Sequence, residues 1–291
     1  MLHQHSISSS ELNLDSGQYT EIDSLIASPF SYTVISAYNN ELVTFPLRVT
    51  QCEQLKVLNL SCNKLQSVPA EIANLTHLEM LDLGHNSINH IIDEIGDLQK
   101  LQFLYLSDNG IKKLPSSLFN LHELIYFNAT DNQLKKLPND FSKLNKLKEL
   151  RLYNNQITDL TDSITQLSSV HEVYLMNNLI TQLPDDISSL TSVKILDFNN
   201  NKIEYISESI SALKQLHTLS LRFNKLGLLA NNIGEVSSLR YIDLRANKLS
   251  SLPDSLLNLP QLIKLDLRWN DFSEEPSIVK ALRDKGCTVF I

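Results

Sequence analysis

One amino acid recurs at a fixed interval through this 291-residue chain. Asparagine occupies every 23rd position from residue 40 to residue 270. No single helix or strand has such a period, so the interval measures a supersecondary unit that repeats. The repeated asparagines are Asn40, Asn63, Asn86, Asn109, Asn132, Asn155, Asn178, Asn201, Asn224, Asn247 and Asn270.

Leucine and similar side chains keep the same interval around each asparagine. In the second unit Leu55, Leu58 and Leu60 precede Asn63, and Leu65 follows it. The alternation of apolar and variable residues predicts a short strand with its leucines on one face and its variable residues on the other. The asparagine is expected to point inward, where a buried amide must be hydrogen-bonded. Stacked copies of such a unit predict a solenoid with a parallel sheet.

The second half of the unit is also regular. Apolar residues three apart, such as Ile187 and Leu190, predict a short 3₁₀ or helical turn opposite the strand. A wider turn side bends a solenoid, so we expect the sheet on the concave face and the turns on the convex face. Thr161, Ser207 and Ala230 occupy the proline position in three units, which we interpret as drift at a tolerant surface position. Seven units carry the proline: Pro46, Pro69, Pro115, Pro138, Pro184, Pro253 and Pro276.

The spacing also predicts the domain organisation. Eleven units, the first starting at Tyr32, fill residues 32–273 without insertion or deletion. Residues 1–31 carry no visible repeat, and we predict a loose, serine-rich start followed by a turn over Glu21 to Ile26 that caps the array. Residues 274–291 are predicted to form a C-terminal cap of one helix and one strand.

The whole unit, L-x-x-L-x-L-x-x-N-x-L-x-x-L-P-x-x-I-x-x-L-x-x, resembles the 23-residue intracellular class of leucine-rich repeats. That class includes the Ras-suppressor and Shoc-type scaffolds, their plant Ras-group-related counterparts and similar bacterial arrays, some delivered into host cells. The resemblance covers residues 32–291. It implies an α/β leucine-rich repeat solenoid of curved, horseshoe form that recognises proteins through its concave sheet.

Composition narrows the range of partners and compartments. The net charge of −8 argues against nucleic acid or an anionic membrane as the target. No stretch of 18 apolar residues occurs, and the first residues lack the pattern of a secretory signal. Three scattered cysteines (Cys52, Cys62, Cys287) do not form the clustered disulfides of secreted relatives. We therefore expect a cytoplasmic monomer, or alternatively a protein that reaches a host cytosol by another secretion route.

The sequence does not indicate an enzyme. None of the metalloprotease, paired-cysteine, nucleophile-elbow or phosphate-loop motifs is present. His77, His122 and His171 fall in different units, and His85 and His90 lie on different segments of one unit. We expect no catalytic residue, no cofactor and no metal; an enzyme or metal protein is the alternative, which stoichiometric zinc in the purified protein would support.

The candidate binding residues are the variable positions of the strands. Aromatic and arginine side chains dominate interface hot spots, and six of the nine tyrosines fall on this face. The opposing interpretation is that aromatic residues simply favour strands. The predicted partner-binding residues are Phe103, Tyr105, Tyr126, Arg151, Tyr153, Tyr174, Arg222, Phe223, Tyr241, Arg245, Arg268 and Trp269.

Three of these arginines (Arg222, Arg245 and Arg268) are 23 residues apart, so they should stack on successive strands. One interpretation is a basic strip that takes an acidic or phosphorylated partner segment. The other is a set of self-neutralising pairs, since Asp243 and Asp266 precede the last two arginines by two residues. Two functions follow: a non-catalytic scaffold or adaptor that binds a protein on its concave face, or a bacterial effector that binds host signalling proteins.

Overall fold

The computed structural model describes residues 10–160 and 162–291. The chain divides into two compact units, residues 1–132 and residues 133–291, which we call the N-terminal unit and the C-terminal unit. The serines expected in a loose start, Ser6, Ser8 and Ser9, and Thr161 at the proline position lie outside the described residues.

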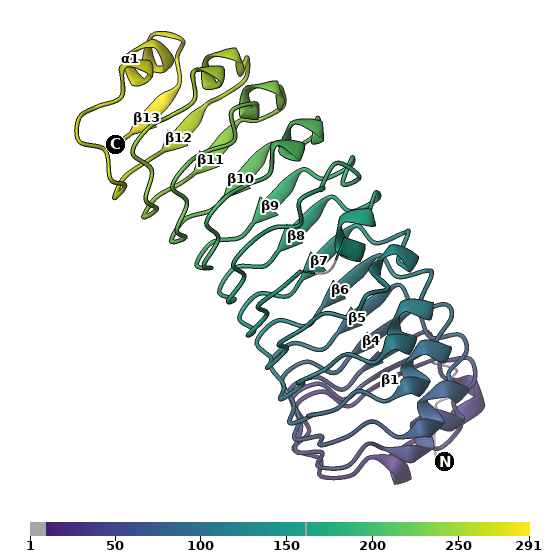
Figure 1. The fold of residues 1–291 in the computed structure, drawn as a ribbon. Helices are drawn as coiled ribbons and strands as arrows, with labels where there is room; N and C mark the ends of the chain where they lie inside the picture. Colours follow the sequence, from purple (N-terminus) through teal and green to yellow (C-terminus); the bar gives the residue numbers. More distant parts are fainter. Residues whose placement is uncertain (1–9, 161) are drawn as a thin grey trace. The chain divides into compact units, whose positions relative to one another are not determined.

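Parallel strands follow one another in chain order through the N-terminal unit (Figure 1). The strands are β1 (Glu11–Asn13), β2 (Val34–Ser36), β3 (Val57–Asn59), β4 (Met80–Asp82), β5 (Phe103–Tyr105) and β6 (Tyr126–Asn128). The 3₁₀ helices are η1 (Asp23–Leu25), η2 (Pro29–Ser31), η3 (Leu47–Gln51), η4 (Ala70–Asn74), η5 (Asp93–Asp97) and η6 (Ser116–Asn120).

The C-terminal unit is built in the same way. Its strands are β7 (Glu149–Arg151), β8 (Glu172–Tyr174), β9 (Ile195–Asp197), β10 (Thr218–Ser220), β11 (Tyr241–Asp243), β12 (Lys264–Asp266) and β13 (Thr288–Phe290). Its helices are η7 (Phe141–Lys143), η8 (Asp162–Gln166), η9 (Glu208–Ala212), η10 (Ile233–Glu235), η11 (Asp254–Asn258) and the α-helix α1 (Ser277–Asp284).

Each strand from β2 onward buries its middle residue and places the two flanking side chains on the other face; in β1 the middle residue, Leu12, is half-buried. We call each 23-residue repeat, from one strand to the next, a coil. Leu58 of β3 pairs with Leu81 of β4, and Leu219 of β10 pairs with Ile242 of β11, so the apolar residues of neighbouring coils stack in register. We call the side that carries the variable strand residues the sheet face and the opposite side the turn face. The predicted fold class, a parallel sheet on one face and short 3₁₀ turns on the other, is confirmed.

The 23-residue interval continues further toward the N-terminus than the asparagines indicate. Leu12 and Leu14 lie 23 residues before Ile35 and Ala37, and β1 pairs in parallel with β2. Gly17 takes the asparagine position in this coil. The coil was missed because the most visible marker of the unit, the asparagine, is absent from it.

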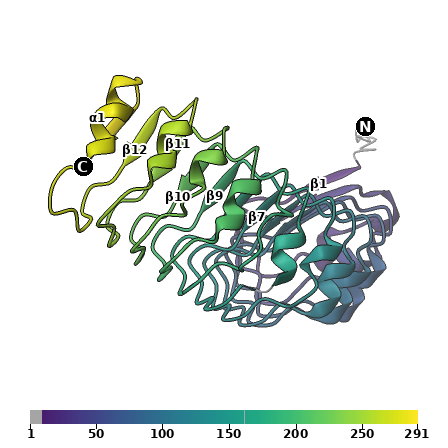
Figure 2. The same cartoon turned by 45° about the horizontal axis from the view of Figure 1, so that its top comes forward.

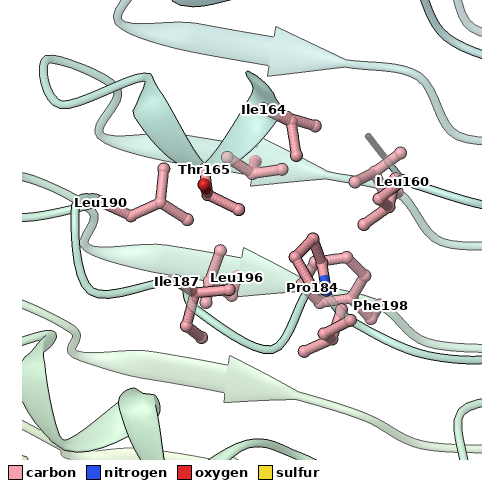
Figure 3. Close-up of a pocket in the computed structure, with 11 residues that line it drawn as sticks. Leu160, Ile164, Thr165, Pro184, Ile187, Leu190, Leu196 and Phe198 are labelled. Atoms are coloured by element: carbon pink, nitrogen blue, oxygen red, sulfur yellow. The ribbon is translucent and has the colours of Figure 1, made fainter. Parts of the chain in front are cut away.

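One predicted turn is only partly formed. Ile187 and Leu190 are buried as predicted, but the coil between β8 and β9 contains no 3₁₀ helix. A small apolar cavity of about 20 Å³ lies beneath it, lined in part by Val173, Ile187 and Phe198 (Figure 3). A water molecule there would have no polar partners, and the space is too small for an organic ligand. We interpret it as a packing defect.

The last coil is covered by α1, drawn in yellow in Figure 2. The helix follows Pro276 and buries Ile278, Val279 and Leu282. Gly286 follows with a φ of +91°, a conformation that glycine adopts without steric cost. The chain then enters β13, which pairs with β12.

Candidate binding surface

The repeated asparagines hold the coils together through the backbone. The Asn63 amide nitrogen donates to the carbonyl oxygens of Leu60, at 3.1 Å, and Ala37, at 2.9 Å. Its side-chain oxygen accepts from the backbone N–H of Leu42 at 3.0 Å. Ala37 and Leu42 belong to the preceding coil, so one side chain links two coils. Asn201 and Asn247 make the same set of bonds in the C-terminal unit.

The residue just before each repeated asparagine has a left-handed backbone. Its φ lies between +49° and +63° in all eleven of the asparagine-containing repeats. Asparagine and aspartate tolerate this conformation, whereas a bulky side chain there is strained by on the order of 1 kcal/mol. Five repeats have another residue at this position: Cys62, His85, and in succession Phe223, Ala246 and Trp269.

In the N-terminal unit, the predicted aromatic residues lie on the sheet face. The rings of Tyr105 and Tyr126 are 4.9 Å apart between centroids. Phe103 begins β5 and pairs with Tyr126 in the sheet register. All three side chains are half-buried. They form a packed aromatic row in which the two tyrosine rings already contact one another.

A second cluster lies at the start of the C-terminal unit. The Arg151 guanidinium lies 5.0 Å from the ring centroid of Tyr174 and also pairs with Glu149. The Tyr174 hydroxyl donates to Glu172 at 2.7 Å. Burial and this bond to a carboxylate raise the pKa of Tyr174, which keeps the phenol neutral. Tyr153 is half-buried on the same face.

Two of the three stacked arginines are already bound to carboxylates. Arg268 donates from Nε and Nη2 to the two oxygens of Asp266, at 2.9 and 2.7 Å. Arg245 donates from Nη2 to Asp243 at 2.6 Å, and its Nε lies 3.6 Å from Asp266. Asp266 is only 1% exposed, so these arginines neutralise a buried charge. Their position on the sheet face is as predicted, but they are closed ion pairs.

Arg222 differs from both of its neighbours. The residue two positions earlier is Ser220, where the next two coils have Asp243 and Asp266. Within the described residues no salt bridge reaches the Arg222 guanidinium, and its buried Nε has no hydrogen-bond partner. The backbone N–H of Arg222 is satisfied separately, by the side-chain oxygen of Asn199 at 2.7 Å.

Exposed aromatic rings are found in the same unit, and one of them lies beside this arginine. Phe223, Tyr241 and Trp269 are 47%, 45% and 65% exposed. The Phe223 and Trp269 rings are nearly parallel, at 19°, with centroids 6.3 Å apart, although one whole coil separates them in the sequence. That coil contributes only Ala246 at the equivalent position. The Arg222 guanidinium lies 5.3 Å from the Phe223 ring centroid, so charge and apolar surface adjoin.

The sequence identified these side chains but not how they differ. Two interpretations of the three arginines were left open, a basic strip and self-neutralising pairs with Asp243 and Asp266. The structure forms the pairs at Arg245 and Arg268 and leaves Arg222, which follows Ser220 by two residues, outside them. The strain at Phe223 and Trp269 was also missed. The available signal was a bulky residue at a position that is Asn or Asp in six of the eleven units.

The described residues were also compared with the requirements of metal, thiol and membrane-spanning sites. Residues 10–160 and 162–291 contain no group of three or more potential metal ligands. Cys52, Cys62 and Cys287 are free thiols, and burial raises the pKa of Cys52 to about 11. No described helix has the length and apolar character needed to cross a membrane.

Comparison with known proteins agrees with this geometry. The family model described as "Leucine-rich repeat region" matches residues 31–176, and two further leucine-rich repeat models match residues 168–226 and 238–259. The chain belongs to the leucine-rich repeat family. A search of curated proteins finds no match to the sequence.

Solved structures show the same architecture. A leucine-rich repeat protein from Leptospira interrogans is 28% identical, with a TM-score of 0.66 over 90% of this chain and 79% of that one. An internalin, InlF from Listeria monocytogenes, has a TM-score of 0.67 at 20% identity, over 90% of this chain and 80% of its own, and shows the fold alone.

A plant receptor shares the fold within a much longer chain. The ectodomain of the Arabidopsis thaliana receptor kinase GASSHO1/SCHENGEN3 was solved in complex with CASPARIAN STRIP INTEGRITY FACTOR 2. It is 29% identical, with a TM-score of 0.70 over 89% of this chain. The present chain spans only 31% of that ectodomain.

Proposed function

We propose that this chain is a non-catalytic protein-binding module that acts as a scaffold or adaptor and binds its partner on the sheet face of the C-terminal unit. One observation carries this proposal: the exposed aromatic side chains of that unit gather there. Phe223, Tyr241, Trp269 and Phe290 are on the sheet face, whereas Tyr205 is elsewhere. Exposed aromatic groups on a rigid sheet supply large contact area at low cost in conformational entropy.

The closed ion pairs support the same surface. The ion pairs hold four side chains in fixed positions: Arg245, Arg268, Asp243 and Asp266. The exposed rings therefore lie on a surface that is already ordered. A binding face that is already ordered loses less entropy when the partner docks. The aromatic row of the N-terminal unit, Tyr105 with Tyr126, is more buried and offers less free area.

The test compares matched surface variants in affinity purification. Phe223→Asn with Tyr241→Ser removes exposed rings from the sheet face. Leu228→Ser removes an apolar side chain outside the strands that is even more exposed, at 66%. We expect mass spectrometry to identify partners retained by wild type and by Leu228→Ser but lost by the sheet-face variant. A partner retained equally by all three proteins would place the interface elsewhere.

The second candidate is a bacterial effector that binds host proteins. Its only support is that a bacterial leucine-rich repeat protein, from Leptospira interrogans, is similar in fold. Its test is separate. A tagged copy should enter the host cytosol from a producing bacterium and should fail to do so from a secretion-defective strain. Absence of the tagged protein from the host with both strains would overturn it.

A further inference from the structure

The sheet face of the C-terminal unit carries a positive charge that the described part of the chain does not pair. Arg245 and Arg268 are each held by the aspartate two residues earlier, but Ser220 leaves Arg222 without one. The Arg222 Nε is buried and lacks a hydrogen-bond partner among the described residues. A buried donor left unsatisfied is costly. The Arg222 side chain as a whole is only half-buried, so its guanidinium can turn toward an arriving acceptor and relieve that cost.

We propose that Arg222 binds a single carboxylate of the partner, at a subsite where Phe223, Ala246 and Trp269 take an apolar side chain from the same partner segment. The inference rests on the proposed function, because it specifies what the partner presents to this face. The partner segment is thus an acidic residue next to an apolar one.

The charge of the site selects a carboxylate over a phosphate. Three aspartates lie near Ser220 in the sheet. Asp197 and Asp243 are its register partners on the two neighbouring strands, and Asp266 is the partner of Asp243 on the next strand. Asp243 and Asp266 are neutralised by Arg245 and Arg268. Asp197 is partly buried, which raises its pKa, and the Arg222 charge opposes that rise without a direct contact. The single unpaired guanidinium balances one negative charge, whereas a phosphate dianion would leave a second negative charge near Asp197.

The neighbouring apolar surface sets the second requirement. Phe223 and Trp269 stack on one another across the intervening coil, which has the small residue Ala246 at the equivalent position. Both rings remain exposed in spite of their strained backbone positions. Strained residues of this kind are concentrated at ligand-binding sites. The Arg222 guanidinium packs 5.3 Å from the Phe223 ring centroid, so a bound acid and its apolar neighbour would contact adjoining groups.

The substitution Ser220→Asp is the sharpest test. It places an aspartate before Arg222 at the spacing found in Asp243–Arg245 and Asp266–Arg268, and it leaves all the aromatic residues in place. We expect it to close the free guanidinium into a third internal ion pair while the protein stays folded. Ser220→Asn is the matched control of equal size without the charge.

The experiment is selection from a random-peptide display library on the wild-type protein, followed by affinity measurement with synthetic peptides. We expect enrichment of Asp or Glu beside an apolar residue. Glu→Gln in a selected peptide should weaken binding at least about tenfold, as expected for loss of a charge-assisted hydrogen bond. Ser220→Asp should weaken the Glu peptide by a similar factor, whereas Ser220→Asn should bind it nearly as wild type does.

The possible outcomes distinguish a failure of the carboxylate subsite from a failure of the proposed sheet-face binding function. The carboxylate subsite would be overturned if the selected peptides show no enrichment of Asp or Glu. It would also be overturned if Glu→Gln in the peptide weakens binding to Ser220→Asp as much as it weakens binding to wild type. If their binding is still lost in Phe223→Asn with Tyr241→Ser, the proposed sheet-face function stands. A selection that yields only peptides insensitive to every sheet-face substitution would overturn both.

Discussion

Gly234 packs against Ser255 so closely that a Cβ atom on the glycine would lie 1.9 Å from the Ser255 carbonyl oxygen. The two residues belong to η10 and η11, the 3₁₀ helices of consecutive coils. Gly96 stands in the same relation to Ser117 in the N-terminal unit, with a distance of 2.3 Å. Glycine at these points therefore allows neighbouring turns to approach closely.

Gly234→Ala should consequently destabilise the protein by about 1–3 kcal/mol, because backbone atoms must shift to admit the methyl group. Gly227→Ala is the control, since a Cβ atom at that residue would meet nothing within 4 Å. That change should be neutral or stabilising by up to about 1 kcal/mol, through the entropy of the unfolded chain. Urea unfolding followed by circular dichroism measures both, and equal midpoints would contradict close packing at Gly234.

Asp266→Asn should lower stability at pH 7 by about 2 kcal/mol, because charge-assisted hydrogen bonds to Arg268 are lost. Burial opposes ionisation of Asp266, but the bonds and charges of Arg268 and Arg245 outweigh it and hold the pKa of this carboxyl below its ordinary value. The ionised pair therefore stabilises the fold at neutral pH, and this contribution is lost as the pH falls below about 4.

The difference between wild type and Asp266→Asn should thus shrink on going from pH 7 to pH 3. Thermal unfolding at the two pH values measures it. Asp254→Asn, an exposed aspartate in η11, gives the same change of charge and should have little effect at either pH. A difference for Asp266→Asn that is constant with pH would exclude the ion pair as its cause. Because Arg245 also pairs with Asp243 and Asp266, a substitution of Arg245 would lower stability as well as binding.

Phe223→Asn and Trp269→Asn should separate binding from stability. Asparagine relieves left-handed strain on the order of 1 kcal/mol, while loss of the ring contact costs about as much. The melting temperature should change little, but partner or peptide affinity should fall at least about tenfold. Calorimetry and binding titration on the same samples check this. A large fall in melting temperature would mean that the rings serve the fold rather than recognition.

Val173→Leu should stabilise the C-terminal unit by up to about 1 kcal/mol, since it adds one methylene beside the cavity of Figure 3. The equivalent position is leucine in most other coils. Val170→Leu adds the same group at a buried position that does not line the cavity, and overpacking there should be neutral or unfavourable. Equal effects of the two changes on the unfolding midpoint would argue against a local void.

The repeat made most of the fold predictable. Leu58, Leu81 and their counterparts fix which side of each strand is buried, and this information is local and periodic. The coil at Leu12 and Leu14 was missed because Gly17 replaces the asparagine. The absence of a 3₁₀ helix near Ile187 depends on packing that a periodic pattern does not record.

The candidate site was less predictable because it arises from departures from the repeat. The spacing of Arg222, Arg245 and Arg268 is the same, yet the hydrogen bonds show that the last two are internal ion pairs. Among the described residues the Arg222 guanidinium has no ion-pair partner, and its Nε has no hydrogen-bond acceptor. The contact between Phe223 and Trp269 required the backbone direction at a left-handed residue, which no hydrophobic pattern encodes. The residues on the face could be read from the sequence, but the structure was needed to show which of them contact one another.

The asparagine bonds described above all point one way along the chain. Asn63 reaches back to Ala37 and Leu42, Asn201 to Leu175 and Ile180, and Asn247 to Leu221 and Leu226. During synthesis, each new asparagine therefore meets backbone partners that the ribosome has already released, and a coil can dock without waiting for the next one. The hydrogen-bond polarity of this array suits folding that proceeds from the N-terminus during translation.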